Sequence, residues 1–564
     1  MKLQCCEGGR YVSGKKTGVR VWPAVLLAGM LTAATARPGP AQGRPERPNV
    51  IFILADDLGW SDTTLYGTTA LYQTPNLERL ARRGMRFRRA YTANPLCSPT
   101  RASILTGLYP GRIGITAPAC HLPEERFDAV LTPRPQPFHR ARGQVSATRL
   151  KHEYVTLAER FQSAGYRTAH FGKWHLGREP YHPQSQGFEV DWPGEPSLPG
   201  PAGGYLAPWR FVRRAELQGK PGEHIEDRMA AEAARFIQQH REQPFYLNYW
   251  AYSVHSPWSA KPELVERYRS RVRPDAPQRN PLYAAMVQSL DDAVRTLLDA
   301  VDRAGIAERT ILVFFSDNGG WIWNPRATSP PGYETIPATS NAPLRGGKAT
   351  LYEGGTRVPC VVVWPGVTRP NSRMDALFSS VDWHPTLLTM AGLPPAPGRQ
   401  LDGVNQERVL RGKAPARDTL FCFFPHYTPA TENIPGTWIR QERWKLIRFH
   451  HDSESQEDRF ELYDLREDPG ETRNLAGVEP ARVQELNRRI ETHLTEIGAL
   501  VPDRNPGFRK DARPGEPAAA GPAIRGWTAV RDCTLAHRNG ALIVTSTGGD
   551  PHLSTRFDPV PAGE

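Results

Sequence analysis

Acidic and amide side chains that can bind a metal follow two apolar runs of the sequence. Asp56 and Asp57 end one such run, and Asp317 and Asn318 end another. All four offer oxygen donors, and Ca²⁺ takes about six to eight such donors at roughly 2.3–2.6 Å. No His or Cys cluster with the spacing of a zinc site accompanies them. Together they predict a calcium site, although either pair alone could be a turn or a helix cap.

Basic side chains and histidines form a second group, which suits an anion. Several of them follow apolar runs, and in open α/β sheets ligands bind outside the carboxyl ends of the strands. Fixed cations beside a metal would stabilise negative charge that develops on the oxygens of an anionic ester. The alternatives are a solvated Lys348 in a glycine turn and a packing role for His175. The members of this group are Arg101, Lys173, His175, His255 and Lys348.

The segment Cys97-Ser98-Pro99-Thr100-Arg101 adds a candidate nucleophile. A proline follows the cysteine by two residues and an arginine by four. A helix should begin just after Cys97, and the dipoles at its N-terminus favour an anion. Alone, the segment leaves two interpretations open: a precursor of a catalytic group, or a buried thiol in a turn before a helix.

Apolar runs alternate with amphipathic segments through the first three quarters of the chain. This order predicts an α/β fold with a large, mostly parallel central sheet flanked by helices, over residues 47–413. The expected strands are 49–54, 166–171, 245–250, 310–315 and 358–364. The expected helices are 74–84, 99–108, 155–164, 227–240, 282–304 and 382–391.

The pattern changes near residue 413. Short strands at 420–424, 445–449 and 460–464, followed by a helix at 479–498, predict a smaller α+β domain over 414–500 with an antiparallel sheet. Residues 501–526 are rich in Pro and Gly and are typical of a linker. The tail 527–564 has short strands around Asn539-Gly540, a hairpin signal. It is either a truncated accessory domain or an addition packed on the core.

The N-terminus is typical of an export signal over residues 1–36. Basic residues precede the apolar run 21–30, and Ala34-Thr35-Ala36 fits the small-residue cleavage pattern. The run is too short to anchor the protein in a bilayer, and no other stretch is long and apolar enough. We therefore expect an exported protein, periplasmic or extracellular, with no membrane span.

With these residues in view, the chain resembles the formylglycine-dependent sulfatases of the alkaline-phosphatase-like superfamily, among them arylsulfatases and N-acetylhexosamine sulfatases. The resemblance runs from about residue 47 to about 500. It rests on the run that ends in Asp56-Asp57, the Cys97 segment, Gly172 to Gly177, Ser316 to Gly319 and Gly346-Gly347-Lys348. It implies an alkaline-phosphatase-like sandwich with a smaller C-terminal domain.

The resemblance implies a role for each matching position. Cys97 is oxidised to formylglycine by a formylglycine-generating enzyme, and the hydrate attacks sulfur. Residue 97 joins Asp56, Asp57, Asp317 and Asn318 around Ca²⁺. Arg101 and Lys173 steady the hydrate, which His175 assists. Lys348 and His255 contact the sulfate, and His255 protonates the leaving alcohol.

Two rival functions remain open. The first is a phosphatase or phosphonate monoester hydrolase of the same superfamily, which usually needs a second metal with extra Asp and His ligands. The second is an inactive protein that binds sulfated glycans, against which the complete set of residues argues. An aryl sulfate compared with an aryl phosphate would separate the first rival from a sulfatase.

Charge and loop composition bear on the substrate. The formal net charge is +12, and removal of residues 1–36, which carry +4, would leave +8. A basic surface suits a polyanion. The sequence has no basic run interleaved with aromatics, which would indicate nucleic acid binding. Sulfated carbohydrate or an aryl sulfate is therefore the expected substrate. The alternative is that the surface is basic in general and binds no particular polyanion. We expect specificity residues in loops at 118–150, 178–225, 321–342 and 425–440, whose Trp209, Arg210 and Trp438 suit sugar faces and neighbouring anions, or loop packing.

Overall fold

The computed structural model describes residues 47–323, 332–333, 335–394, 398 and 400–514, together with the backbone of four strands between 527 and 555. The predicted export signal at 1–36 lies outside the described residues. None of the helices in the described ranges has the length and apolar character needed to cross a membrane.

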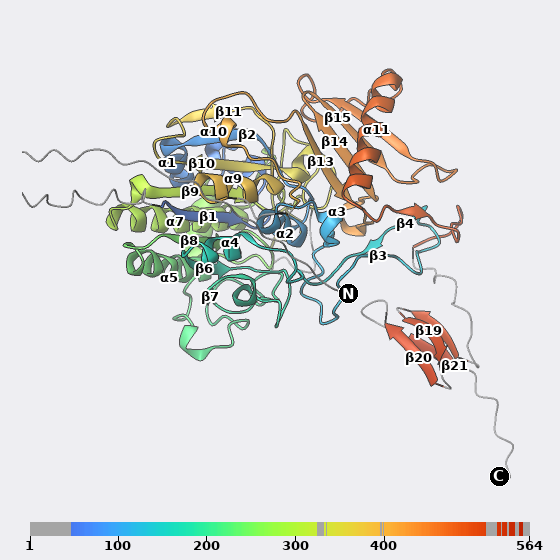
Figure 1. The fold of residues 1–564 in the computed structure, drawn as a ribbon, viewed down its shortest axis with the longest axis horizontal. Helices are drawn as coiled ribbons and strands as arrows, with labels where there is room; N and C mark the ends of the chain where they lie inside the picture. Colours follow the sequence, from blue (N-terminus) through green and yellow to red (C-terminus); the bar gives the residue numbers. More distant parts are fainter. Residues whose placement is uncertain are drawn as a thin grey trace, which may run out of the picture. The chain divides into compact units, whose positions relative to one another are not determined.

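A nine-stranded sheet forms the centre of the part of the chain that the structure describes (Figure 1). Its strands are β1 (Asn49–Ala55), β2 (Met85–Tyr91), β6 (Arg167–Gly172), β7 (Val190–Trp192), β8 (Phe245–Trp250), β9 (Thr310–Ser316), β10 (Arg357–Val363), β11 (Ser372–Met374) and β12 (Phe378–Ser379). The order is β11-β2-β10-β9-β1-β8-β6-β7, with β12 beside β2. Only β10 runs antiparallel to its neighbours among these pairs, so the predicted mostly parallel sheet is confirmed.

Helices cover both faces of this sheet because its central strands are apolar on both sides. Along β1, Ile51 and Ile53 pack into one buried cluster, and Phe52 and Leu54 pack into another. The first cluster includes α1 (Pro75–Arg83), α5 (Ile225–Gln239), α6 (Pro262–Arg269) and α7 (Pro281–Arg303). The second includes α2 (Cys97–Thr106), α4 (Leu157–Ser163) and α9 (Trp383–Met390).

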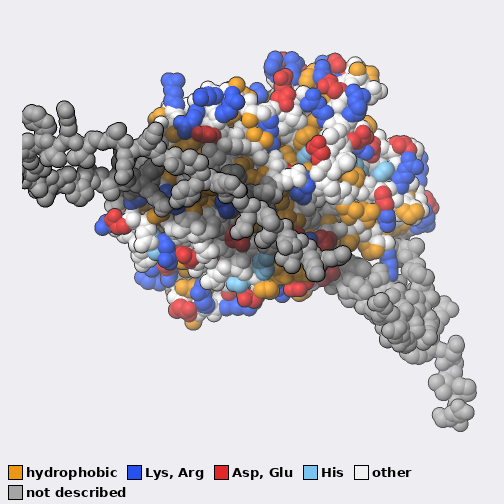
Figure 2. All heavy atoms as spheres, viewed as in Figure 1, with side chains coloured by type: hydrophobic (Ala, Val, Ile, Leu, Met, Phe, Trp, Pro, Cys, Tyr) orange, Lys and Arg blue, Asp and Glu red, His pale blue; other side chains and the backbone are white. Residues whose placement is uncertain are grey.

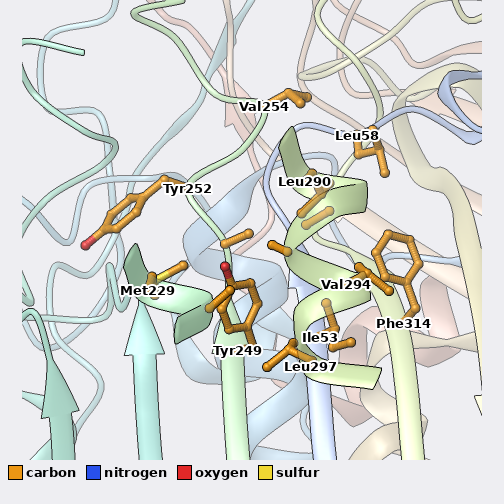
Figure 3. Close-up of a cluster of buried hydrophobic side chains, with 14 of the residues drawn as sticks. Ile53, Leu58, Met229, Tyr249, Tyr252, Val254, Leu290, Val294, Leu297 and Phe314 are labelled. Carbon is orange, nitrogen blue, oxygen red and sulfur yellow. The ribbon is translucent and has the colours of Figure 1, made fainter. Parts of the chain in front are cut away.

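Figure 3 shows how α7 packs on the first face: Leu290, Val294 and Leu297 lie against Ile53 of β1 and Phe314 of β9. Each fully buried aliphatic or aromatic side chain of this kind contributes about 1.5–3 kcal/mol to folding. This packing fixes β1 and β9 relative to α7. It therefore also positions the residues that directly follow these two strands.

A four-stranded antiparallel sheet forms the predicted C-terminal α+β region. Its strands are β13 (Thr419–Phe424), β14 (Gly436–Gln441), β15 (Trp444–Phe449) and β16 (Arg459–Asp464), paired in that order. Helix α11 (Pro480–Glu496) lies across β14 and β15 (Figure 1), with Leu486, Ile490 and Leu494 buried against the sheet. Strand β14 was not predicted, because residues 425–440 were expected to be a substrate loop.

Short elements complete the described fold. They are α3 (Pro110–Ile113), α8 (Glu353–Thr356), α10 (Glu407–Leu410), β3 (Val130–Leu131), β4 (Ala141–Arg142), β5 (Gln144–Val145), β17 (Asp503–Arg504), β18 (Trp527–Arg531), β19 (Cys533–Arg538), β20 (Ala541–Ser546) and β21 (His552–Thr555). Strand β17, inside the segment predicted to be a linker, pairs with β4. Strands β19 and β20 pair from Arg538 and Ala541 outward, which is the hairpin predicted around Asn539-Gly540.

A buried charge cluster joins the two sheets. Lys445 Nζ on β15 lies 3.1 Å from Glu353 Oε1 at the start of α8 and 2.8 Å from Glu471 Oε1. Arg440 on β14 and the Tyr91 hydroxyl contact the other Glu353 oxygen at 3.1 and 2.7 Å. Burial raises the pKa of Glu471 to about 7, although Lys445 opposes this rise. The cluster therefore depends on the Lys445 charge.

Replacing Lys445 by methionine should destabilise the protein by about 3–5 kcal/mol, because two buried carboxylates would lose their shared cation. The measurement is the free energy of unfolding in urea. Lys413→Met, on an exposed loop residue, is the matched control and should change stability by about 0.5 kcal/mol or less. Equal stabilities for the two variants would contradict the importance of the cluster.

Candidate active site

The carboxyl ends of β1, β6, β8 and β9 meet at one edge of the central sheet. Ala55 pairs with Ser316 across β1 and β9, and Trp250 pairs with both Leu54 and Gly172. The residues that follow these four strands must therefore lie close together. The sequence pattern predicted the candidate metal ligands and anion-binding residues at this edge.

The candidate metal ligands form one buried group. Ligand atoms of Asp56, Cys97 and Asp317 all lie within 4.8 Å of one another. Asp57 joins them through its backbone N–H, which donates to Asp317 Oδ1 at 3.1 Å. Asn318 joins them through Nδ2, which donates to Asp57 Oδ1 at 2.8 Å. The structure thus brings all five predicted ligands together.

Cys97 is the first residue of α2, whereas the helix was expected to begin just after it. Its side chain is 1% exposed, and the Arg101 guanidinium follows one turn later, fully buried. Two guanidinium nitrogens of Arg101 donate to Asp317 Oδ2 at 2.7 and 3.0 Å, and a third nitrogen donates to the Lys173 carbonyl at 2.6 Å. Arg101 therefore fixes the start of α2 against the ends of β6 and β9.

Two lysines neutralise the paired carboxylates. Lys173 Nζ donates to Asp56 Oδ2 at 2.6 Å, and both groups are fully buried. Lys348 Nζ lies 2.7 and 2.8 Å from the two oxygens of Asp57. Asp56 and Asp57 thus each have their own lysine, and Asp317 is paired with Arg101, so charge balance permits the burial of all three carboxylates.

Three histidines border this group, and one of them was not predicted. His255 Nε2 lies 3.8 Å from Asp57 Oδ2, and its Nδ1 lies 2.5 Å from the Ser256 carbonyl. Because that carbonyl can only accept, Nδ1 carries the proton and Nε2 faces the site. His175 Nε2 lies 3.2 Å from Nδ1 of His121. His121 comes from a loop with no periodic pattern, so only its residue type could have suggested it.

Left-handed backbone conformations cluster at this site. Asp57, His175 and Ala349, the neighbour of Lys348, have φ values of 63°, 56° and 61°. Non-glycine residues in this region cost of order 1–3 kcal/mol each and concentrate at functional sites. Gly172 has φ 108°, and an added Cβ would lie 2.0 Å from the Trp250 carbonyl oxygen. The close approach of β6 to β8 therefore needs glycine here.

Burial and charge set the protonation of the site. Burial raises the pKa of the Cys97 thiol, although Lys173 and Lys348 oppose the rise. Burial also raises the pKa of Asp56 against the effect of Lys173. For Asp57, burial acts in the same direction, but Lys348 and His255 outweigh it and hold the pKa well below its usual value.

The pKa values of both predicted catalytic histidines are lowered by burial and by nearby lysines. Burial lowers the pKa of His175 and of His255 far below the usual value. Lys173 lowers the His175 pKa further, and Lys348 does the same for His255.

The donor set fits a calcium ion. Two buried oxygens, Asp56 Oδ1 and Asn318 Oδ1, accept no hydrogen bond, although Arg101 lies 3.6 Å from the first. Unsatisfied buried oxygens are costly, and a hard cation would satisfy both. Apart from the Cys97 sulfur, every donor of the group is an oxygen. The residues present therefore suit the group that the sequence predicted.

Comparison with known proteins identifies the chain. The family model "Sulfatase" matches residues 48–393, and the model "N-sulphoglucosamine sulphohydrolase, C-terminal" matches residues 347–499. N-acetylgalactosamine-6-sulfatase of Homo sapiens is 31% identical over 496 residues, which cover 82% of this chain and 88% of that protein. The chain belongs to the sulfatase family. The predictions of a sulfatase family member, of the fold class and of a sulfuric ester hydrolase are confirmed.

Further relatives agree with this assignment. Arylsulfatase A of Homo sapiens is 31% identical over 523 residues, covering 85% of the sulfatase described here and 92% of the relative. The crystal structure of Ps i-CgsB in complex with k-i-k-neocarrahexaose has a TM-score of 0.62 at 24% identity. It covers 79% of this chain and 93% of its own, and shows that the fold is shared.

Trp209 and Trp438, for which the sequence left sugar contact and loop packing both open, are buried in this sulfatase. Trp438 is fully buried in the core between the antiparallel sheet and the catalytic domain, and Trp209 is 1% exposed. The Trp209 indole N–H donates to the Tyr205 carbonyl at 2.9 Å. Both tryptophans pack in the core, so the alternative of loop packing holds for them. Arg210 is exposed, as a substrate contact would have to be.

Proposed function

We propose that this sulfatase hydrolyses sulfate monoesters of sulfated polysaccharides or their oligosaccharides, with formylglycine at position 97 and Ca²⁺ bound beside it. The observation that carries the proposal is the place of Cys97. It is the first residue of a buried helix, with ligand atoms of Asp56 and Asp317 within 4.8 Å of its sulfur. A thiol with a raised pKa in such a place is a poor nucleophile, which favours its conversion into another group.

Formylglycine, formed by oxidation of Cys97, supplies as its hydrate an oxygen nucleophile that no encoded side chain offers. Arg101 and Lys173 hold this position, because Arg101 binds both the Lys173 carbonyl and Asp317. His175 lies on the same edge of the sheet and can accept a proton through its unpartnered buried Nδ1. Arg101 and Lys173 would orient residue 97, and His175 would move protons to and from it.

Four oxygen ligands would hold the calcium ion: Asp56, Asp57, Asp317 and Asn318. Bound there, the ion would draw electron density from an oxygen of the sulfate group. Lys348 and His255 both contact Asp57 and so lie where that sulfate would be bound. Lys348 would balance its negative charge, and His255 would hold a proton on Nε2 for the leaving alcohol once the anionic substrate is bound.

The relatives and the surface charge support the proposed substrate class. One relative is named for N-acetylgalactosamine 6-sulfate, and the Ps i-CgsB structure contains a neocarrahexaose. The formal net charge of +12 favours a polyanionic substrate. The test is hydrolysis of an aryl sulfate and of an aryl phosphate under the same conditions. Preference for the phosphate would favour the rival phosphatase function.

We further propose that the protein is exported and that residue 97 is modified first. In the folded chain the Cys97 side chain is 1% exposed, so a formylglycine-generating enzyme could not reach it. The modification would therefore precede folding, and residues 1–36 would direct export to the periplasm or outside the cell.

His255→Ala should slow sugar sulfates far more than activated aryl sulfates. An alcohol leaves slowly without a proton donor, and general acid catalysis contributes about 10²–10⁴-fold. A phenol with strongly electron-withdrawing groups needs no such help, so its turnover should fall by about tenfold or less. The measurement is kcat against leaving-group pKa for wild type and variant. A parallel loss for all leaving groups would show that His255 only supports the structure.

A further inference from the structure

A basic groove lies between the edge of the central sheet and the antiparallel sheet, apart from the catalytic residues. Its volume is about 930 Å³, within the range of about 300–1,000 Å³ that is typical of ligand pockets. Nine arginines and four acidic residues line it, and none of the predicted catalytic or metal-binding residues does. Lys and Arg side chains gather on the upper surface in Figure 2, over the region where Figure 1 labels β2 and β11.

Part of this positive charge is not balanced within the protein. Arg88 pairs with Asp375, and Arg443 pairs with Asp464. Arg89, Arg373 and Arg466 form no ion pair with any residue that the structure describes. Arg373 and Arg466 are exposed, and Arg89 is half-buried. These three guanidinium groups, named here the free arginines, are available to an anion.

The groove also holds like charges close together. The pKa of Arg440 is lowered to about 9, first by burial and then by the charge of Arg89. Arg440 is paired with Glu353 at 3.1 Å, whereas no ion pair offsets the charge of Arg89 among the described residues. An anion bound beside Arg89 would relieve this repulsion.

We infer that the groove binds a sulfated stretch of a polysaccharide chain at a distance from the ester that is cleaved. This inference rests on the proposed function. The polysaccharide that is cleaved at the active site would also bind at the groove. Guanidinium groups form paired hydrogen bonds with sulfate as they do with carboxylate and phosphate. Several sulfates along one chain would engage several of the free arginines at once.

The aromatic residues of the groove disfavour single-stranded nucleic acid. Trp60 stacks on Tyr66 with ring centroids 4.3 Å apart, and the Arg357 guanidinium lies 4.5 Å from the centroid of the Trp60 ring. Trp60 is 8% exposed, so it offers no open face on which a base could stack. The groove therefore recognises charge along a chain.

The triple variant Arg89→Gln, Arg373→Gln, Arg466→Gln tests the groove. The probe is fluorescently labelled chondroitin sulfate, and binding is followed by anisotropy in a Cys97→Ala background, where no turnover occurs. Each exposed ion pair contributes little, so we expect affinity to fall by about tenfold at about 0.15 M salt. The matched control, Arg271→Gln, Arg303→Gln, Arg488→Gln, removes the same charge from exposed positions elsewhere and should change affinity by about twofold or less.

Catalysis by the same triple variant separates this inference from the proposed function. With Cys97 intact, kcat/KM for a small aryl sulfate should be unchanged, while KM for the polysaccharide rises and kcat is kept. Absence of aryl sulfate turnover in the wild type would refute the proposed function and leave the binding result standing. If the groove variant and the control variant lost affinity for chondroitin sulfate to the same extent, the inference that the groove is a binding site would be wrong. Duplex DNA serves as a competitor, with its concentration expressed as negative charges. If it displaced labelled chondroitin sulfate at a lower concentration than unlabelled chondroitin sulfate does, the choice of ligand would be wrong.

Discussion

Cys97→Ala should lower turnover of sulfate esters by about 10⁶-fold, the loss typical when an enzyme loses its covalent nucleophile. Alanine cannot be oxidised to an aldehyde, so neither hydroxyl of the hydrate would be present. The fold should persist, because the change removes one buried sulfur atom and leaves the contacts of Arg101 and Lys173 intact. The measurements are kcat/KM for an aryl sulfate and the urea unfolding curve.

Cys360→Ala provides the matched control for this prediction. Cys360 is a fully buried free cysteine on β10, where it is paired with Phe87 of β2. Its replacement should lower stability slightly and leave kcat unchanged. Substantial activity in Cys97→Ala would mean that residue 97 is not the source of the nucleophile.

Asp317→Asn should abolish tight calcium binding and reduce kcat/KM by about 10³-fold or more, because metal ions stabilise transition-state charge by several kcal/mol. The substitution keeps the shape of the side chain. It removes a charge from a group that also binds Arg101 and the Asp57 backbone. Calcium affinity is measured by calorimetry, and the rise in Tm on adding calcium gives a second readout that does not depend on activity.

Asp291→Asn separates loss of the metal from loss of a buried carboxylate. Asp291 accepts hydrogen bonds from the backbone N–H groups of Asn76 and Leu77 at the start of α1, away from the strand ends. We expect this variant to bind calcium as the wild type does. If Asp317→Asn also kept wild-type calcium affinity, the ligand assignment would be wrong.

The arrangement of the site was predictable because it depends on which residues directly follow the parallel strands. Polar residues directly after apolar strands must meet at one edge when the strands are parallel, as Asp56 and Asp317 do. Direct contacts were not predictable in the same way. That Lys348 contacts Asp57 depends on a loop path with a left-handed residue at 349, which no periodic pattern reveals.

Burial of single tryptophans was the least predictable feature. Trp438 lies on a short strand whose alternation is weak, and only its pairing between β13 and β15 makes it a core residue. His121 had no signal beyond its residue type, although it lies 3.2 Å from His175. In both cases tertiary packing decides the role of the residue, and local sequence does not encode it.

Mass spectrometry of the peptide that contains residue 97, taken from protein with measured sulfatase activity, tests the central claim most directly. The account predicts the mass of the aldehyde at this position, with trapping by a hydrazine reagent and a modified fraction that scales with specific activity. A free thiol at residue 97 in fully active protein would contradict it.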